Sequence, residues 1–461
     1  MNIRDKHILV LGLGDTGLSM VRFLLRHGAR VSVADSREAP PHATRFHAEF
    51  PGVPLVTGPF SDTLFAGIDL IAISPGVPLA DPKVAAAVAR GVPVAGDVEL
   101  FAQTLTPHPS RLTPHVLAIT GSNGKSTVTE MTGAMCRAAG LKTTVAGNIG
   151  LPVLDALIEA EQNGMPGVFV LELSSFQLET TASLDASAAT MLNISEDHLD
   201  RYTGMDHYSA AKTRVFHGTG SQILNRDDAR SMAMALPGRK IETFGLDAPV
   251  NECDWGILKQ DGQQWLAQGS RRLLPVNELP LAGLHNAANA LAALALCRAI
   301  GLPFEPLLDA LRHFKGLPHR VEKVAEISGV TFYDDSKGTN VGATVAALAG
   351  MPCKVVLIAG GDGKGQDFSP LAPAVARHAR AVVLIGRDGA KIGAVLEHSG
   401  VPLLRAGNME EAVQFSLQQA QAGDAVLLSP ACASYDMFRN YIHRAEAFIS
   451  AAQQLAREEQ R

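Results

Sequence analysis

The stretch that decides the fold is VLAITGSNGKST at residues 116–127, in which an apolar run is followed at once by glycines, a lysine and hydroxyl side chains. The apolar run predicts a buried strand, and Val128, Met131 and Met135 predict a helix after the loop. Backbone amides of such a loop can surround phosphate groups. The loop departs from the full P-loop pattern at Ile119, where the first glycine would stand, and a fortuitous turn is the alternative interpretation.

Two side chains of this loop have expected roles in nucleotide binding. Lys125 would neutralise the phosphates, and the hydroxyl of Ser126 would bind Mg²⁺. Because the loop lies between a predicted strand and a predicted helix, nucleotide binding is the preferred interpretation.

Length and composition indicate several compact domains. At roughly 150 residues per domain, 461 residues correspond to about three domains. Hydrophobic residues make up 46% and charged residues 19%, which excludes a disordered or coiled-coil chain. The 40 basic and 46 acidic residues give a net charge of −6, so we expect no nucleic-acid partner. The first apolar run, residues 8–11, is too short for a signal or membrane segment, so we expect a cytoplasmic protein without membrane insertion. We also expect a monomer.

Alternating strand and helix patterns predict an α/β protein of three domains at residues 1–109, 110–316 and 317–461. The first and third are expected to be Rossmann-like, and the central P-loop domain to have a mainly parallel sheet with smaller antiparallel strands at 255–276. A proline-containing linker is predicted at 103–115 and a hinge at 314–318. The other predicted strands are Ile8–Leu11, Val31–Ala34, Leu70–Ile73, Val168–Leu173, Ala188–Leu192, Val330–Tyr333, Val355–Ala359, Ala381–Ile385 and Ala425–Leu428.

A complete G-x-G-x-x-G motif begins at Gly12 and ends at Gly17, and Asp35 stands at the end of the next predicted strand. Alone, this motif indicates a dinucleotide site. The motif is not specific to dinucleotides, because glycines that let the backbone approach a ligand closely, together with a helix N-terminus, favour the binding of any diphosphate. A tight turn without a ligand is the alternative.

Several polar residues fall near the ends of strands in the central domain, where open α/β sheets bind ligands. Glu172 closes an apolar strand, and a buried carboxylate there is costly unless a cation or a hydrogen-bond network meets it. His198 follows a buried strand and is either a metal ligand or a structural histidine. Asn286 and Asn289 share a helix face, so they could hold a nucleotide or cap the helix, and the residues alone leave both open. Lys212 would pass for surface charge.

The third domain carries cationic side chains beside glycine turns. They occur in the stretches 317–320, 334–340 and 360–365, which contain Arg320, Lys337 and Lys364. Turn chemistry explains the glycines, whereas repeated lysines and arginine suit phosphates and carboxylates.

In this order, the motifs resemble those of the Mur ligases of peptidoglycan synthesis. The resemblance covers nearly the whole chain and rests on six segments, and the sequences ELSSFQLE at 172–179 and LSPACAS at 428–434 are most similar to those of the members that add D-glutamate. One departure is Ala445, where the family usually has glycine. The six segments are 120–127, 147–150, 172–179, 196–202, 317–320 and 335–340.

The resemblance implies an ATP-dependent ligase that joins D-glutamate to UDP-N-acetylmuramoyl-L-alanine through an acyl phosphate. The first domain would bind the UDP substrate, the second ATP and the third D-glutamate. The third domain is expected to swing closed and exclude water. The alternatives are an NAD-dependent oxidoreductase, a non-catalytic nucleotide-binding ATPase module, and the related ligase that extends folate, against which the glycine-rich first domain argues.

The same resemblance implies the site residues. The UDP substrate would contact Asp15, Thr16, Asp35, Ser36, Arg37, Ser74, Gly76, Asn148, Gln177 and His198. ATP would contact Gly121, Ser122, Asn123, Gly124, Lys125, Ser126, Thr127, Asn286, Asn289, Arg320, Asp335 and Lys337. D-Glutamate would contact Thr339, Lys364, Ser434, Tyr435 and Tyr441, although the family more often has leucine and phenylalanine at the last two.

The residues implied to take part directly in the chemistry are Lys125, Glu172, His198, Lys212 and Arg320. One Mg²⁺ would lie near Ser126 and Glu172, and another near His198 and a carbamylated Lys212. Carbamylation converts a cationic lysine into an anionic oxygen ligand.

Overall fold

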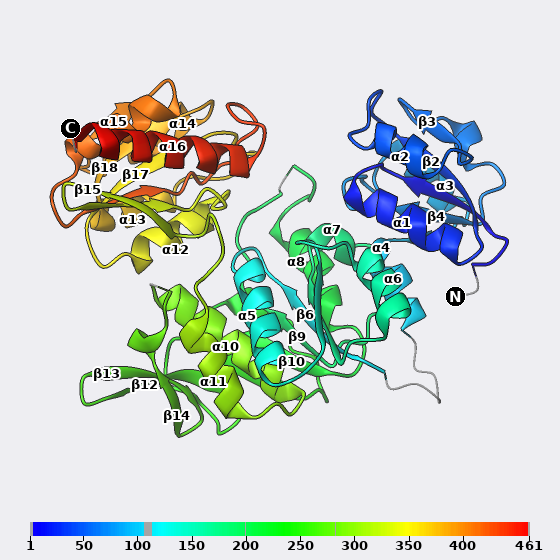
Figure 1. Ribbon diagram of the computed structural model, residues 1–461, viewed down its shortest axis with the longest axis horizontal. Helices are drawn as coiled ribbons and strands as arrows, with labels where there is room; N and C mark the ends of the chain where they lie inside the picture. The colour runs from blue at the N-terminus through cyan, green and yellow to red at the C-terminus, as the bar shows by residue number, and fades with distance from the viewer. Residues whose placement is uncertain (1–2, 106–112, 199, 282, 460–461) are drawn as a thin grey trace.

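The computed structural model describes residues 3–105, 113–198, 200–281 and 283–459, and shows three α/β domains (Figure 1). The central domain, with the strands β6 to β14, lies beneath the other two in this view. The predicted α/β class and three-domain architecture are confirmed. The predicted boundary between residues 109 and 110, and most of the predicted linker, lie outside the described residues.

The first domain is a parallel sheet in the order β3-β2-β1-β4-β5. Its strands are β1 (His7–Leu11), β2 (Arg30–Asp35), β3 (Leu55–Thr57), β4 (Leu70–Ile73) and β5 (Val94–Ala95). Its helices are α1 (Asp15–Arg26), α2 (Ala43–Glu49), the 3₁₀ turn η1 (Asp62–Phe65), α3 (Pro82–Ala89) and α4 (Asp97–Thr104). The glycine motif joins β1 to α1, where a Cβ on Gly17 would lie 1.9 Å from the Gly12 carbonyl oxygen. This glycine is therefore required for the helix to approach the strand.

The central domain has a mixed sheet in the order β14-β13-β12-β11-β10-β9-β6-β8-β7, with antiparallel pairing along β12, β13 and β14. Its parallel part consists of β6 (His115–Thr120), β7 (Thr143–Gly147), β8 (Val168–Glu172), β9 (Ala188–Met191), β10 (Ser221–Asn225) and β11 (Ile241–Phe244). The antiparallel strands, as predicted for 255–276, are β12 (Trp255–Gln260), β13 (Gln263–Gln268) and β14 (Arg271–Pro275).

The helices of the central domain pack on both sides of the P-loop strand. Helix α5 follows the loop, and α10 and α11 pack against it. The helices of this domain are α5 (Lys125–Ala138), α6 (Val153–Asn163), α7 (Ser175–Leu178), α8 (Met205–Thr213), η2 (Arg214–Phe216), α9 (Ala229–Met232), η3 (Val276–Glu278), α10 (Leu284–Ala299) and α11 (Phe304–His313).

The third domain has a sheet in the order β15-β16-β20-β17-β18-β19, in which β15 pairs antiparallel with β16 at one edge. Its strands are β15 (Glu322–Ile327), β16 (Val330–Asp334), β17 (Val355–Gly360), β18 (Ala379–Ile385), β19 (Leu403–Arg405) and β20 (Ala425–Leu428). Its helices are α12 (Val341–Gly350), α13 (Leu371–His378), α14 (Gly389–Leu396), α15 (Met409–Gln419) and α16 (Tyr441–Glu459). Phe438 has helical spacing with Tyr441, Ile442 and Ala445 in the sequence, but it lies before α16.

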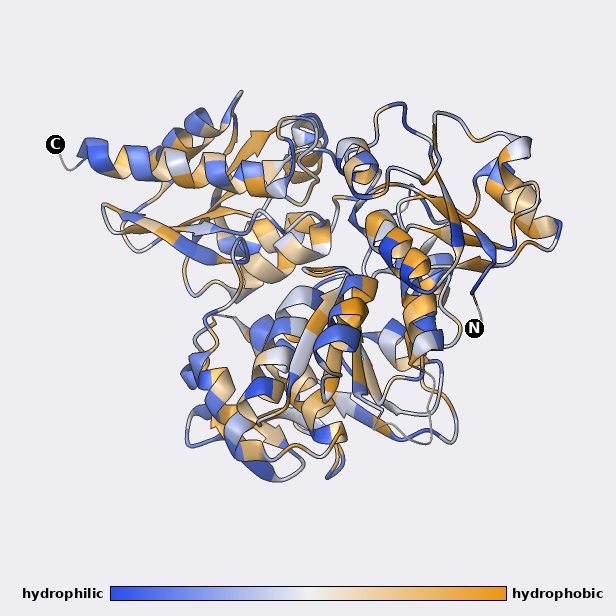
Figure 2. Cartoon of the chain, turned by 45° about the vertical axis from the view of Figure 1, so that its right-hand side comes forward, coloured by the Kyte–Doolittle hydropathy of each residue, from blue (hydrophilic) through white to orange (hydrophobic). Residues whose placement is uncertain are grey.

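Apolar packing ties the first two domains together. Figure 2 shows the hydrophobic residues gathered on the strands and on one side of the helices. One buried cluster contains side chains of α1 and α4 together with those of α6 and β8, and the Phe101 and Phe169 rings meet edge to face at 5.1 Å. The apolar clusters of the third domain, among the described residues, are built from that domain alone. The third domain therefore contacts the rest through other groups.

Within the described ranges, no helix is long and apolar enough to cross a membrane.

Candidate active site

The P-loop occupies the turn between β6 and α5, as its flanks predict. Gly124 begins the turn into α5 with φ +83°, and a Cβ there would lie 2.6 Å from Asn289 Oδ1 on α10. Glycine therefore permits both the left-handed backbone and the close approach of the asparagine. Helix α5 has no side-chain cap, so its first amides face the phosphate region. The amides of Ser122 and Asn123 instead donate to Asn193, at 2.8 Å each, and hold the loop in shape.

Lys125 is half-buried and lies against its own loop. Its Nζ donates to the carbonyl oxygens of Gly121 and Ser122, at 2.9 Å each. Burial lowers the pKa of Lys125, and the carboxylates of Glu172 and Asp197 oppose that shift. A phosphate would offer this ammonium stronger acceptors than carbonyl oxygens.

A cavity of about 260 Å³ opens between the P-loop, α10 and the third domain. Asn289 Nδ2 lies 3.3 Å from Asn286 Oδ1, so the two asparagines share a helix face as the spacing predicts. Predicted ATP-binding residues that line the cavity are Asn123, Gly124, Thr127, Asn286, Asn289, Arg320 and Asp335.

The third domain sends charged groups to this cavity. Arg320 Nη2 donates to Ser126 Oγ at 3.0 Å, across the domain boundary. Burial raises the pKa of Asp335 to about 7, although a hydrogen bond from Ser429 opposes the shift. Burial and the nearby Arg320 lower the pKa of Lys337 to about 8, and its Nζ lies 3.9 Å from the centre of the Tyr441 ring.

Glu172 and Lys212 form the buried floor of the site. Glu172 Oε1 accepts from Asn148 Nδ2 at 2.7 Å, whereas Oε2 is buried and has no hydrogen-bond partner among the described residues. Lys212 is 1% exposed, so the sequence-based view of it as surface charge is wrong. Its Nζ donates to the Gly121 carbonyl at 2.8 Å, and burial, reinforced by Lys125, lowers its pKa well below the usual range.

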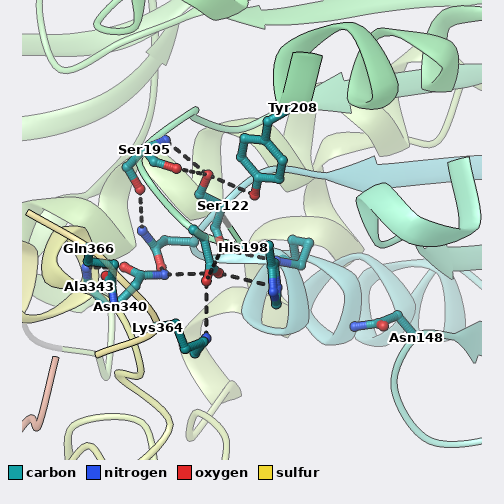
Figure 3. Close-up of polar contacts among 12 residues, drawn as sticks. Ser122, Asn148, Ser195, His198, Tyr208, Asn340, Ala343, Lys364 and Gln366 are labelled. Atoms are coloured by element: carbon teal, nitrogen blue, oxygen red, sulfur yellow. Dashed lines mark hydrogen bonds and ion pairs between the residues drawn. The ribbon is translucent and has the colours of Figure 1, made fainter. Parts of the chain in front are cut away.

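His198 lies on the loop after β9, with φ +55°. Its Nε2 is 3.6 Å from Asp197 Oδ2, its ring packs 4.7 Å from that of Phe176, and burial lowers its pKa. Figure 3 shows His198 beside Lys364 of the third domain. The unpartnered carboxylate oxygen of Glu172 and the hydroxyl of Ser126 are oxygen donors of the kind that Mg²⁺ prefers, so these two residues fit this cation. The His198 imidazole is a donor that divalent transition metals use more readily.

A second cavity, of about 480 Å³, joins the first domain to the central domain. Asp35 receives the Leu13 amide at 2.7 Å and the Arg37 guanidinium at 2.6 Å; burial opposes its ionisation, but these hydrogen bonds outweigh burial and lower its pKa. Asn148 lines this cavity and also donates to Glu172, so the cavity leads toward the P-loop. The predicted UDP-substrate residues that line it are Asp15, Thr16, Asp35, Ser36, Arg37, Ser74, Gly76, Asn148 and Gln177.

The predicted D-glutamate residues are less closely grouped. Lys364 Nζ lies 3.2 Å from Asp197 Oδ1, facing the central domain. Ser434 is buried, Thr339 is half-buried, and Tyr441 contacts Lys337. Tyr435 is 75% exposed, so its side chain lies at the surface in this arrangement.

Arg201 was not singled out from the sequence. Its guanidinium donates to the carbonyl oxygens of Pro75 and Val77 in the first domain, at 2.6 and 3.4 Å, and pairs with Glu179 at 3.0 Å. Its Cζ lies 4.1 Å over the Phe176 ring. Pro75 and Val77 line the larger cavity, so Arg201 fixes that wall. The sequence feature that could have indicated its role is its position in the segment 196–202, one of the six segments that carry the family resemblance.

Taken together, the fold and the two cavities define a three-domain α/β protein of the P-loop nucleotide-binding class. Family models match residues 6–96 (Mur ligase MurD-like, N-terminal domain), 119–297 (Mur ligase middle domain) and 319–432 (Mur ligase, glutamate ligase domain). The chain therefore belongs to the Mur ligase family. This finding contradicts the two alternative interpretations, an NAD-dependent oxidoreductase and a non-catalytic nucleotide-binding module.

Relatives in two organisms cover nearly the whole chain. A UDP-N-acetylmuramoylalanine–D-glutamate ligase of Thiobacillus denitrificans is 60% identical, over 99% of this chain and 98% of its own. One of Methylobacillus flagellatus is 59% identical, over 100% and 99%. The crystal structure of the UDP-N-acetylmuramate-alanine ligase of Thermotoga maritima aligns with a TM-score of 0.60 at 20% identity, over 98% of this chain and 100% of that one, and shows the same fold.

The pKa of Lys337 predicts a pH-dependent affinity for ATP. This lysine is cationic below about pH 8 and neutral above it, so, if it contacts ATP as the family resemblance implies, ATP binding weakens as the pH rises through 8. Titration calorimetry should give a dissociation constant about tenfold higher at pH 9 than at pH 7. Lys337→Arg keeps its charge and should lack this contribution; the same slope in both proteins would exclude Lys337 as its source.

Arg201→Lys should weaken the binding of UDP about five- to tenfold, because a lysine cannot hold both carbonyl oxygens of the cavity wall and the Glu179 carboxylate at once. Calorimetry with UDP measures the effect. Arg26→Lys is the matched control, since Arg26 also joins the first two domains, but through Glu161, which does not line the cavity. Equal UDP affinity in both variants would contradict the role given to Arg201.

Proposed function

We propose that this protein is an ATP-dependent ligase that joins D-glutamate to UDP-N-acetylmuramoyl-L-alanine in the synthesis of peptidoglycan precursors. The names of its close relatives support this assignment. The structural observation that carries it is the contact of Asn148 with Glu172, at 2.7 Å, because it connects the larger cavity with the P-loop. A substrate in one cavity could thus present its acid end to a nucleotide in the other.

The reaction follows from charge. A carboxylate is a poor electrophile, so an oxygen of the substrate's alanine carboxylate attacks the γ-phosphorus of ATP and ADP leaves. The amine of D-glutamate then attacks the acyl carbon, inorganic phosphate leaves, and the nitrogen loses a proton to give the amide. Lys125 and Arg320 reduce the repulsion between the two anions and stabilise charge on the transferring phosphoryl group.

Two Mg²⁺ sites belong to this proposal. Ser126 and Glu172 would hold one ion, and His198 and carbamylated Lys212 the other. Bound Mg²⁺ would add positive charge beside the phosphates. The lowered pKa of Lys212 supports the carbamate, because only a neutral amine reacts with CO₂.

The contact residues given by the family resemblance complete the proposal. The larger cavity takes the uridine diphosphate, the smaller takes ATP, and Thr339, Lys364, Ser434, Tyr435 and Tyr441 take D-glutamate. Tyr435 would have to move to do so, since it is exposed. The domains are proposed to span 1–109, 110–316 and 317–461. We place the reaction in the cytoplasm, where ATP is supplied, and propose a monomer because each predicted ligand contact lies within one chain.

Phosphate release from ATP tests the reaction. With UDP-N-acetylmuramoyl-L-alanine present, D-glutamate should support sustained turnover, whereas L-glutamate, L-lysine or no amine should not. Lys125→Met and Lys212→Met should each lower kcat by about 10²-fold or more, because each removes buried positive charge or a metal ligand from the site. Lys323→Ala is the control, since this exposed lysine, among the residues that the structure describes, forms its ion pair with Glu326 alone. Equal turnover with L-glutamate would contradict the proposed specificity.

The carbamate has its own test. The enzyme is incubated with ¹³C-bicarbonate, and its ¹³C spectrum should show one carbamate carbon that is absent from Lys212→Arg. In wild type, activity should fall when CO₂ is removed and return when it is restored. A spectrum without that carbon in an active wild-type enzyme would overturn the modification while leaving the ligase reaction intact.

A further inference from the structure

Asn340 joins the third domain to the P-loop. It is 3% exposed and directly precedes α12. Its Oδ1 accepts from the Ala343 amide at 2.9 Å and so caps the helix. Its Nδ2 donates across the domain boundary to Asn123 Oδ1 at 3.0 Å and points to Asp197 Oδ2 at 3.5 Å. Both ends of the side-chain amide are therefore used, one for each domain.

The central domain fixes the acceptor that Asn340 meets. The Nδ2 of Asn123 donates to Ser195 Oγ at 3.2 Å, which turns its Oδ1 toward the third domain (Figure 3). Its backbone is held on both sides by Asn193, through an amide donor at 2.8 Å and a carbonyl acceptor at 3.1 Å. Asn123 also lines the nucleotide cavity. A movement of Asn123 when a nucleotide binds would therefore change its hydrogen bond with Asn340.

Contacts around the Asn340–Asn123 hydrogen bond fix its position. A Cβ on Gly342, in the first turn of α12, would lie 2.9 Å from Ser195 Oγ, so the helix end packs closely on the central domain. Asp197 accepts from Lys364 as well as facing Asn340, so its carboxylate meets two groups of the third domain. Because the apolar clusters of the third domain are its own, polar contacts such as these set its position.

We propose that Asn340 is a positioning residue that couples the P-loop to the amino-acid end of the site. Its bond to Asn123 holds the third domain in the register that presents Thr339, its chain neighbour, and Lys364 to the acyl phosphate. The amino-acid part of this inference rests on the proposed function. By thermodynamic linkage, a nucleotide that orders Asn123 favours the closed third domain, and closure favours the nucleotide.

The cap and the interdomain bond can be separated. Serine caps helices about as well as asparagine, so Asn340→Ser should melt within about 2 °C of wild type. Serine lacks the amide donor, and aspartate places a carboxylate beside Asp197. We expect the KM for D-glutamate to rise about tenfold in Asn340→Ser and further in Asn340→Asp. Asn408→Ser is the matched control, because Asn408 caps α15 of the same domain and should leave the kinetics unchanged.

A double-mutant cycle tests the bond itself. If Asn123 and Asn340 act together, adding Asn340→Ser to Asn123→Ala should change kcat/KM for D-glutamate by less than twofold. Wild-type kinetics in Asn340→Ser, or a full tenfold further loss in the double variant, would overturn the proposal.

Scattering separates this inference from the proposed function. With a non-hydrolysable ATP analogue, Asn340→Asp should have a larger radius of gyration than wild type, whichever amine the enzyme uses. Equal radii would overturn the coupling. Absence of D-glutamate-dependent turnover in wild type would overturn the function and leave the scattering result standing.

Discussion

The structure depends on the burial of opposite charges at the carboxyl ends of β6 and β8. Lys125 lies there with Glu172, and Asp197 faces them from the loop after β9. Lys212 is buried beside them, and its pKa is lowered well below the usual range. Each ion removed from water costs several kcal/mol unless other groups replace the lost hydration. The carbonyl oxygens of the P-loop replace part of the lost hydration of Lys125, and Asn148 does so for Glu172. Glu172 Oε2 has no hydrogen-bond partner among the described residues, so a cation bound there would stabilise the carboxylate further. A triphosphate and its metal ions would complete this set of charges.

The domains divide this chemistry between a fixed and an adjustable part. The first two share an apolar cluster, so the wall of the larger cavity and the P-loop are held together by packing. The third contacts the P-loop through hydrogen bonds and ion pairs, among them Arg320 with Ser126 and Lys364 with Asp197. Such contacts can be exchanged for substrate groups at low cost, whereas an apolar interface would have to be exposed to water. This difference suits a ligase that binds its substrates where its domains meet.

Much of the fold followed from local sequence. The alternation of apolar runs with helical spacing located β6, β8, β9 and the central strands of the third domain, because buried parallel strands are nearly continuous in apolar residues. The edge strands β3, β5 and β19 escaped notice because two or three residues are too few to show a pattern. The sequence pattern also missed β7, β10, β11 and β15. Phe438 continues the helical spacing of α16 but lies before it.

Without the family resemblance, the site could be predicted only where a single local motif contains its residues. The P-loop, Asn286 with Asn289, and the glycine motif with Asp35 each sit in one local segment, and the structure groups them as their spacing indicates. The burial of Lys212, the span of Arg201 and the bond between Asn123 and Asn340 depend on how domains pack, so short-range patterns could not give them. Tyr435, placed by resemblance alone, lies at the surface.

The central claim is that buried cations allow a carboxylate to take a phosphoryl group before the amide forms. Its most direct test is the fate of oxygen. UDP-N-acetylmuramoyl-L-alanine labelled with ¹⁸O in the alanine carboxylate is converted with ATP and D-glutamate, and the inorganic phosphate is analysed by mass. Transfer through an acyl phosphate predicts one oxygen from the carboxylate in each phosphate released. Unlabelled phosphate, formed while the amide product accumulates, would contradict the account.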